Sequence, residues 1–214
     1  MDFAQATIEQ EKKEASKYHY NTWQLDMNQV NSYAWYDNVF SEEEIEDICK
    51  YGDLEYEKTQ AQIGGSGTGE VNPEIRKTTI TWIPINDETS WVFRKLTDVI
   101  QAANAQWFQY ELRQIESLQY SVYDVGDFYE RHTDHHFQGP GQYCRKLSFV
   151  MQLTDPAEYE GGKTQIITQK DPWHIEQKKG TISFFPSYCL HEVEELTKGQ
   201  RKALVGWVAG PKWK

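Results

Sequence analysis

The sequence predicts a mainly β fold, a sandwich or jelly roll, with helices ahead of the strands. Eight short strand-like runs follow one another from Arg113 onward, with turn residues between them. Before them, residues 89–108 carry apolar side chains at helical spacing. Aromatic residues make up 14% of the chain against an apolar fraction of 38%, so large rings should supply much of the core. The expected strands are 115–123, 128–135, 147–153, 163–168, 174–177, 181–185, 191–196 and 203–208.

Length and charge limit the number of domains and the class of partner. The 214 residues suffice for one domain, which we expect at 31–214 with a β core at about 113–209, after a polar arm at 1–30. The net charge of -11 argues against DNA or an anionic membrane as a main partner. The three cysteines lie far apart in the sequence. No apolar run resembles a signal or membrane segment. We therefore expect a soluble, cytoplasmic protein without a disulfide framework; the sequence leaves its oligomeric state open.

Ahead of the β region, several segments have recognisable patterns. Residues 33–40 are rich in aromatic side chains and predict a strand. Ser41 precedes Glu44 by three residues, a capping-box pattern that begins a helix. Residues 60–72 contain four glycines and predict either a surface loop or a lid over an active site. Residues 76–85 alternate and are rich in β-branched side chains, so they predict another strand.

Three polar features of the β region could carry chemistry. His132 and Asp134 lie two residues apart on the expected strand 128–135, so both side chains should project from one face. His191 begins a later strand, and Arg201 follows it by ten residues. Taken singly, His191 is explained as a core histidine bonded to a carbonyl, and Arg201 as a solvated charge in a turn.

Taken together, these residues indicate a more specific chemistry. Two imidazoles and one carboxylate leave coordination positions open on a metal, which is the ligand set of non-haem Fe(II) oxygenases. A structural zinc site would instead be closed by four protein ligands. A guanidinium one strand away can bind a carboxylate with two hydrogen bonds, as a dicarboxylate co-substrate such as 2-oxoglutarate requires.

The surrounding sequence resembles the Fe(II)/2-oxoglutarate dioxygenases, in particular the prolyl 4-hydroxylase branch and the bacterial PKHD-type hydroxylases. The resemblance covers roughly residues 33–207 and is strongest from 119 onward. Its motifs are Tyr123-x-x-Gly126-x-x-Tyr129-x-x-His132-x-Asp134, Leu147-Ser148-Phe149, Leu153-Thr154-Asp155-Pro156, Tyr159-Glu160-Gly161-Gly162, Pro186-Ser187, Leu190-His191 and Arg201.

The resemblance implies a double-stranded β-helix (a jelly roll, cupin-like) with N-terminal helices packed on one sheet. It implies an oxygenase that hydroxylates an unactivated carbon, with Fe(II) bound by His132, Asp134 and His191. It also implies that Arg201 and Tyr123 bind 2-oxoglutarate, with O2 as co-substrate and ascorbate as a reductant. No catalytic residue is expected beyond the metal ligands.

Substrate residues follow from a weaker part of the resemblance. The stretch from Arg76 to Trp82 is similar to the strand that lines the peptide groove of algal-type prolyl hydroxylases. For Tyr129 and Trp207, simple core packing is the alternative. The expected substrate residues are Arg76, Thr78, Gln119, Tyr129 and Trp207.

Two further expectations concern the pocket. Gln152 stands where prolyl hydroxylases often place a tyrosine that assists the arginine, which is a departure from the family pattern. Apolar walls are expected from Phe149, Ile182, Phe184 and Trp207.

The leading substrate is a prolyl or other residue of a peptide or protein. Alternatives are a hydroxylase of a free amino acid or small metabolite, a nucleobase oxygenase, and a non-enzymatic cupin-like metal-binding module. A nucleobase enzyme would typically have further arginines beyond the distal histidine, whereas only lysines follow Arg201. The expected partners are therefore a peptide, protein or small molecule, and neither nucleic acid nor membrane. The intact set of three ligands with Arg201 argues against a module without activity.

Overall fold

The structure is a computed structural model that describes residues 31–63, 69–135, 143–168, 170 and 172–213. The polar arm predicted at 1–30 lies outside the described residues. Neither of the two α-helices in these ranges has the length and apolar character to cross a bilayer. All three cysteines are free, as predicted.

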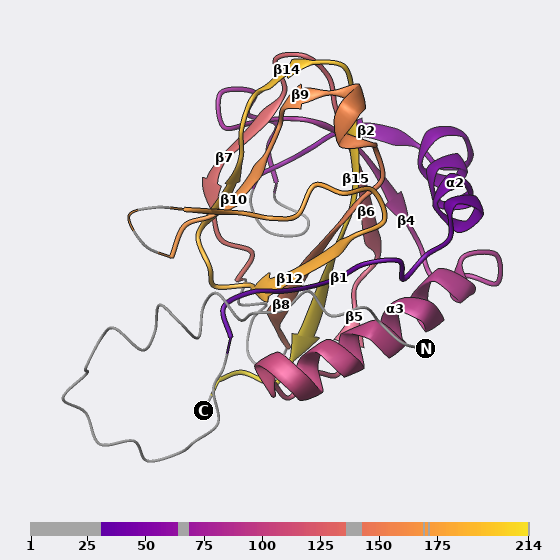
Figure 1. Ribbon diagram of the computed structural model, residues 1–214, viewed down its shortest axis with the longest axis vertical. Coiled ribbons are helices and arrows are strands. Elements are labelled where there is room, and N and C mark those ends of the chain that lie inside the picture. Colours follow the sequence, from indigo (N-terminus) through magenta and orange to yellow (C-terminus); the bar gives the residue numbers. More distant parts are fainter. Residues whose placement is uncertain (1–30, 64–68, 136–142, 169, 171, 214) are drawn as a thin grey trace.

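The larger of two facing sheets is antiparallel and has eight strands (Figure 1). One short strand, β5 (Gln114–Ile115), lies off the main path and pairs with β15. The order along that path is β1 (Ala34–Tyr36), β12 (Ile182–Pro186), β8 (Cys144–Gln152), β15 (Arg201–Gly210), β6 (Leu118–Tyr123), β4 (Thr79–Ile83) and β2 (Lys58–Gln60).

The smaller sheet has five strands, and two further strands form a separate two-stranded sheet. From β6 to β15, successive strands of the two main sheets alternate between them, apart from one hairpin within the small sheet, which is the double-stranded β-helix predicted from the resemblance. The strands outside the large sheet are β11 (Trp173–His174), β10 (Thr164–Ile166), β13 (His191–Val193), β7 (Phe128–His132) and β3 (Arg76–Lys77), and the pair β14 (Leu196–Lys198) with β9 (Glu160–Gly161).

Two helices cover one face of the large sheet, as predicted (Figure 1). The first, α2 (Glu42–Lys50), begins with the predicted capping box: the Glu44 amide donates to Ser41 Oγ at 3.2 Å, and the Ser41 amide donates to Glu44 Oε2 at 2.7 Å. The second, α3 (Ser90–Ala103), continues as a π-helical turn. The remaining helical segments are η1 (Tyr51–Glu55), η2 (Asn104–Phe108) and the 3-10 turn η3 (Pro156–Glu158).

Side chains of the large sheet alternate between this helix-covered face and the space between the sheets. On β8, Phe149 and Met151 pack with residues of α2 and α3 in the main hydrophobic core. Their neighbours Val150 and Gln152 project to the opposite face, toward the small sheet. The functional side chains described below occupy this inner face.

Several predicted strands are interrupted, and the topology explains where. The run 76–85 breaks at Thr78 because β3 belongs to the small sheet and β4 to the large one. The run 191–196 divides into β13 and β14, which pair with different partners. The run 128–135 was predicted too long, since β7 ends at His132. The run 115–123 divides into β5 and β6.

The glycine-rich segment 60–72 is only partly described, because residues 64–68 lie outside the described ranges. On either side of them, Ile63 and Glu70 form an isolated antiparallel bridge. Gln62 and Ile63 line the cavity described below. The alternative of a lid therefore stays a prediction.

Candidate metal and co-substrate site

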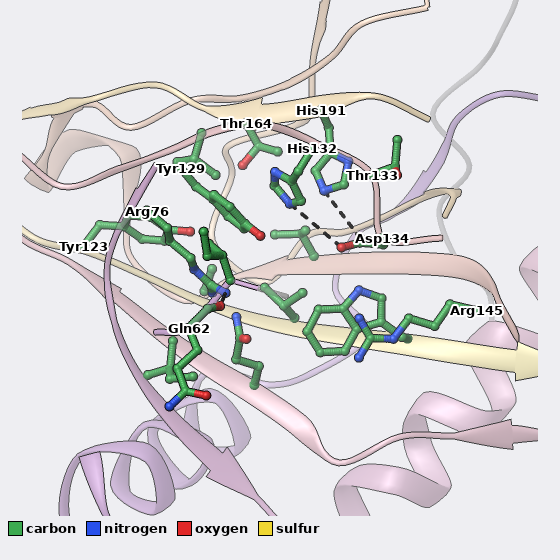
Figure 2. A pocket seen from close by; sticks show the side chains of 18 of the residues that line it. Gln62, Arg76, Tyr123, Tyr129, His132, Thr133, Asp134, Arg145, Thr164 and His191 are labelled. Carbon is green, nitrogen blue, oxygen red and sulfur yellow. Dashed lines mark hydrogen bonds and ion pairs between the residues drawn. The ribbon is translucent and has the colours of Figure 1, made fainter. Parts of the chain in front are cut away.

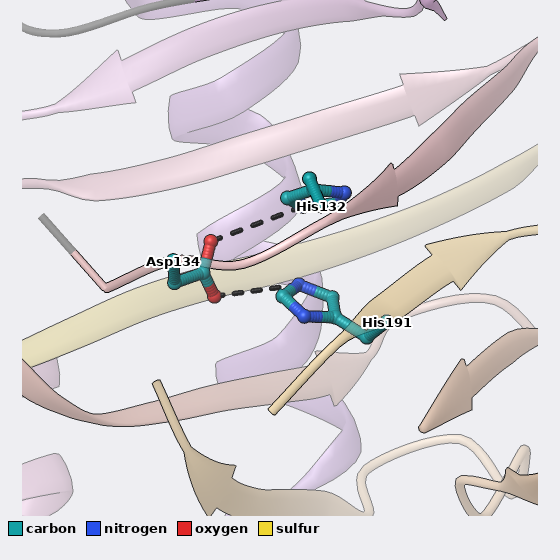
Figure 3. Close-up of side chains that lie close together, drawn as sticks. All are labelled: His132, Asp134 and His191. Carbon is teal, nitrogen blue, oxygen red and sulfur yellow. Dashed lines mark ion pairs between the residues drawn. The ribbon is translucent and has the colours of Figure 1, made fainter. Parts of the chain in front are cut away.

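The three predicted metal ligands meet at one end of two neighbouring interior strands of the small sheet (Figure 3). His132 is the last residue of β7 and His191 the first residue of β13, and their Cα atoms are direct cross-strand partners. Asp134 was predicted to lie on the same strand as His132. It lies instead in the loop that follows β7, two residues beyond the end of the strand. The loop turns its carboxylate back toward both imidazoles.

The ligand atoms of these residues converge closely. Asp134 Oδ1 lies 3.9 Å from His132 Nε2, and Oδ2 lies 3.4 Å from His191 Nε2. The two imidazole centroids are 4.1 Å apart. One atom from each side chain falls within 4.8 Å of the others, a spacing that lets a single ion contact all three.

Backbone carbonyls orient both imidazoles. His132 Nδ1 lies 2.8 Å from the Glu130 carbonyl, and His191 Nδ1 lies 3.0 Å from the Cys189 carbonyl. A carbonyl oxygen only accepts, so each Nδ1 must carry the hydrogen. In the neutral ring this leaves the Nε2 lone pair directed toward Asp134, as a metal ligand requires.

The protonation states suit a cation as well. Burial, followed by the proximity of His191, lowers the pKa of His132 to about 3, so this ring is neutral at physiological pH. Burial by itself raises the pKa of Asp134, but the two imidazoles and a hydrogen bond outweigh it and hold the pKa below its usual value. The site therefore presents one carboxylate.

Asp134 is anchored from the large sheet. Ser148 on β8 donates its hydroxyl to Asp134 Oδ2 at 2.8 Å, and the Ser148 and Ser187 hydroxyls are 2.9 Å apart. All three side chains are buried. The carboxylate is therefore held by a hydroxyl that belongs to the facing sheet, and its position depends on how the two sheets pack.

The residues fit a divalent metal. Two Nε2 lone pairs and a carboxylate converge, and a cation between them relieves the repulsion of electron-rich atoms. The set of two imidazoles and one carboxylate suits Fe(II) with open positions, and differs from the sulfur-rich, closed sets of structural zinc.

Arg201 is a buried cation on β15 of the large sheet, with a side chain only 2% exposed. Its Nε and Nη2 both donate to Gln152 Oε1, at 3.2 and 3.0 Å, and Nη2 donates to Thr164 Oγ1 at 3.3 Å. The guanidinium lies 5.4 Å from the ring centroid of Tyr123, its cross-strand partner. Within the described part of the chain it forms no ion pair, so its charge is free for an acidic ligand.

Arg201 and the three predicted ligands line one cavity of about 730 Å³ between the sheets. This volume is typical of sites for small molecules. Figure 2 shows the three ligands among other residues that line this cavity. Of the predicted substrate residues, Thr78 is buried and does not line the cavity. Those that do line it, beside Tyr123, are Arg76, Gln119, Tyr129 and Trp207.

The predicted apolar walls were largely wrong. Phe149, Ile182 and Phe184 belong to the core beneath the helices, on the opposite face of the sheet from the cavity. The reason is the strand alternation, since the cavity-facing positions are the neighbours of these residues. Of the predicted four, only Trp207 lines the cavity; its apolar companions there include Val150, Phe185 and Val205.

A polar group on the cavity wall was missed. Arg145 donates to Glu116 through Nε at 2.9 Å and Nη2 at 2.6 Å, and its guanidinium lies 3.9 Å from the Trp207 ring centroid. Trp82 lies against Trp207 with centroids 6.1 Å apart. No local sequence pattern predicts that these four residues lie together, because they come from four separate strands or loops.

Residues 118–209 match the model of one protein family, described as the 2OG-Fe(II) oxygenase superfamily. The matched region contains His132, Asp134, His191 and Arg201. A PKHD-type hydroxylase of Prochlorococcus marinus is 38% identical over 96 residues, covering 45% of this chain and 42% of that protein. One of Rippkaea orientalis is 30% identical over 127 residues, covering 57% of each. The chain thus spans about half the length of the curated relatives it matches, 42% and 57% for these two.

Solved structures share the fold at lower identity. A Pseudomonas putida prolyl-4-hydroxylase has a TM-score of 0.65 at 20% identity, covering 85% of this chain and 94% of that one. A Trichoplax adhaerens prolyl hydroxylase in complex with a hypoxia inducible factor peptide fragment has a TM-score of 0.64 at 17% identity, covering 83% of each chain. At these identities the likeness shows a common fold.

These comparisons confirm the resemblance predicted from the sequence, to 2OG-Fe(II) oxygenases of the PKHD and prolyl 4-hydroxylase branch. The description of the matching family names Fe(II) and 2-oxoglutarate, the cofactor and co-substrate that the resemblance implies. Ascorbate and the role of each individual residue stay predictions.

Proposed function

We propose, from the match of residues 118–209 to the 2OG-Fe(II) oxygenase superfamily, that this chain is an Fe(II)- and 2-oxoglutarate-dependent hydroxylase. The observation that carries the proposal is that the three converging ligand atoms share a cavity with Arg201, which is buried and has no carboxylate partner among the described residues. In this proposal His132, Asp134 and His191 hold the iron.

Bound Fe(II) and 2-oxoglutarate supply the activation of O2, so that one oxygen atom enters a substrate C–H bond while the co-substrate becomes succinate and carbon dioxide. The protein residues bind and orient the metal and the co-substrate and shield them from solvent. The carbonyls of Glu130 and Cys189 keep the two Nε2 atoms unprotonated, and Ser148 fixes one carboxylate oxygen of Asp134.

Arg201 would bind the distal carboxylate of 2-oxoglutarate. Gln152 and Thr164 are neutral acceptors that hold the guanidinium without neutralising it. Gln152 thereby takes a positioning role where prolyl hydroxylases often have a tyrosine. The Tyr123 hydroxyl, on the cross-strand partner of Arg201, would donate a further hydrogen bond to the same carboxylate.

The substrate we propose is a residue of a peptide or protein, with a prolyl residue as the first candidate. The named relatives are hydroxylases, and the solved structures of the same fold include prolyl hydroxylases, one with a peptide bound. Trp82 lines the cavity and its side chain is 43% exposed, so this part of the cavity wall reaches solvent.

The test is conversion of 2-oxoglutarate to succinate by the full chain, with and without Fe(II), against a panel of proline-containing peptides read by mass. We expect iron-dependent succinate and a peptide that gains one oxygen atom. Asp134→Ala should abolish iron retention after anaerobic loading, whereas Asp124→Ala, at an exposed turn outside the cavity, should retain it. Iron retained by Asp134→Ala would refute the ligand assignment, and absence of both turnover and iron binding in the unaltered chain would refute the function.

A further inference from the structure

Arg76 is a second buried cation of the cavity, and among the described residues no carboxylate pairs with it. Its side chain is 8% exposed and lines the cavity. A guanidinium carries five N–H donors, yet in the described part of the chain Arg76 makes one hydrogen bond, from Nη1 to the Gln62 carbonyl at 3.3 Å. Its Nε is buried without any partner among these residues. Leaving a buried charge and donor unsatisfied is costly, which indicates a missing ligand.

The guanidinium is held beside the predicted metal ligands. Arg76 on β3 is the cross-strand partner of Tyr129 on β7, and its guanidinium lies 4.4 Å from the Tyr129 ring centroid. The Tyr129 ring stacks on His132 with centroids 3.5 Å apart. Figure 2 shows Arg76 and Tyr129 together on one side of the triad, with Arg145 on the other. A ligand of Arg76 would therefore lie next to the reacting centre.

The other cations near this wall are neutralised by carboxylates. Arg145 has two hydrogen bonds to Glu116. Lys77, the next residue along β3, points away and lies 3.2 Å from Asp127. Among the described residues that line the cavity, Arg76 and Arg201 are the arginines without an anionic partner.

The charges of the proposed cofactors account for only one of these two arginines. The two positive charges of Fe(II), the Asp134 carboxylate and Arg201 together leave two positive charges, which the dicarboxylate 2-oxoglutarate matches. Arg76 is then left as the single uncompensated charge of the occupied cavity. With a neutral substrate bound, the Arg76 guanidinium would stay buried without an anionic partner.

We propose that Arg76 binds an oxyanion of the substrate, and specifically a carboxylate, so that the enzyme selects substrates with an acidic group close to the hydroxylated carbon. This inference rests on the proposed function. A planar guanidinium with a free Nε edge matches the two oxygens of a carboxylate. An acidic side chain of a peptide, a chain-terminal carboxylate and a free amino acid all present this group, and a phosphate is the competing oxyanion.

The experiment measures binding by calorimetry to the full chain loaded with Mn(II) and 2-oxoglutarate, so that Arg201 is already occupied. The probes are the N-acetyl derivatives of proline, alanine and glutamine, each compared with its own primary amide, and inorganic phosphate. Each pair differs only in the carboxylate. We expect the acid of at least one pair to bind at least roughly tenfold more tightly than its amide, because the amide leaves Arg76 unpaired.

Three variants identify the residue responsible. Arg76→Gln should abolish the preference for the acid, and Arg76→Lys should keep a weakened preference, because it retains the charge and loses the planar fork. Lys77→Gln removes the same charge from the same strand but outside the cavity, and should leave the preference unchanged. Binding of Mn(II) with 2-oxoglutarate to each variant verifies that it is folded.

The outcomes separate this inference from the proposed function. If Mn(II) and 2-oxoglutarate fail to bind the unaltered chain, the proposed function fails. If they bind but acids and amides bind alike, or if Arg76→Gln keeps the acid preference, the Arg76 assignment is refuted. If phosphate binds more tightly than every acid, and Arg76→Gln loses this binding, the assignment of a carboxylate ligand is refuted. Arg76 would then form an oxyanion site for phosphate.

Discussion

At the scale of single residues, the candidate ligands are oriented in two different ways. His132 and His191 bond to carbonyls two residues before them, so the adjacent backbone orients each imidazole. Asp134 instead depends on Ser148, which lies on β8 of the facing sheet. The carboxylate is thus the ligand whose position requires the completed fold.

Replacing Ser148 should weaken metal binding without removing a ligand. We expect Ser148→Ala to lower the affinity for Mn(II) or Fe(II) by roughly 10- to 100-fold, because the partner that orients a ligating carboxylate is lost. Equilibrium dialysis measures the affinity. Ser183→Ala is the matched control, since Ser183 is equally buried in the same sheet but bonds to the Tyr33 hydroxyl at 3.0 Å. Equal affinities in the two variants would show that Ser148 does not position Asp134.

Gln152 offers a test of the co-substrate site. We expect Gln152→Glu to raise the KM for 2-oxoglutarate at least roughly tenfold, because a fixed carboxylate beside Arg201 would compete with that of the co-substrate. Succinate formation at varied 2-oxoglutarate gives the KM. Gln114→Glu adds the same charge at an exposed position and should leave the KM unchanged. An unchanged KM in Gln152→Glu would place 2-oxoglutarate elsewhere.

The sequence indicated which residues could form the candidate site, but not all of their local geometry. His132, Asp134, His191 and Arg201 were recognisable because few combinations of side chains serve this chemistry. The argument from strand parity was wrong for Asp134, since β7 ends at His132. The pairing of Arg145 with Glu116 joins residues 29 positions apart and depends on tertiary contacts that no short motif encodes.

At the scale of elements, both faces of the large sheet are buried, and this limits what periodicity reveals. On β12, Phe184 packs beneath the helices while Phe185 contacts His191 on the inner face, with ring centroids 4.8 Å apart. Strands buried on both faces have continuous apolar runs, so the pattern does not mark the inner face. For this reason Phe184 was assigned to the cavity in place of Phe185.

The start of α2 was predictable because its signal is local. We expect Ser41→Ala to lower the free energy of unfolding by about 1 kcal/mol, since the Glu44 amide loses its acceptor. Urea denaturation monitored by circular dichroism measures the change. Glu43→Gln, exposed in the same first turn, should change the stability by less than about 0.5 kcal/mol. A loss no larger for Ser41→Ala than for this control would mean that the capping box contributes little.

At the scale of the whole molecule, the short strands with turns between them predicted the two-sheet architecture, but not where the chain changes sheet. At Thr78 it passes from β3 in the small sheet to β4 in the large one, inside what reads as one continuous strand. Such a crossing places Arg76 beside Tyr129 and Trp82 beside Trp207, on two sides of one cavity. The cavity is therefore a product of the topology.

Buried, neutral His132 couples the stability of the whole metal-free protein to pH. Its folded-state pKa of about 3 lies below the ordinary value of 6.5, so between these values the unfolded chain binds a proton that the folded protein does not. The free energy of unfolding should therefore fall as the pH falls through this window, by up to about 1.4 kcal/mol per pH unit from this group. Urea titrations from pH 7 to pH 4 in the presence of a chelator measure the slope. His132→Gln should reduce it, whereas His174→Gln, which removes an exposed histidine, should not. Equal slopes in the wild type and His132→Gln would show that His132 gains its proton at the same pH in both states, and so is not held neutral by the fold.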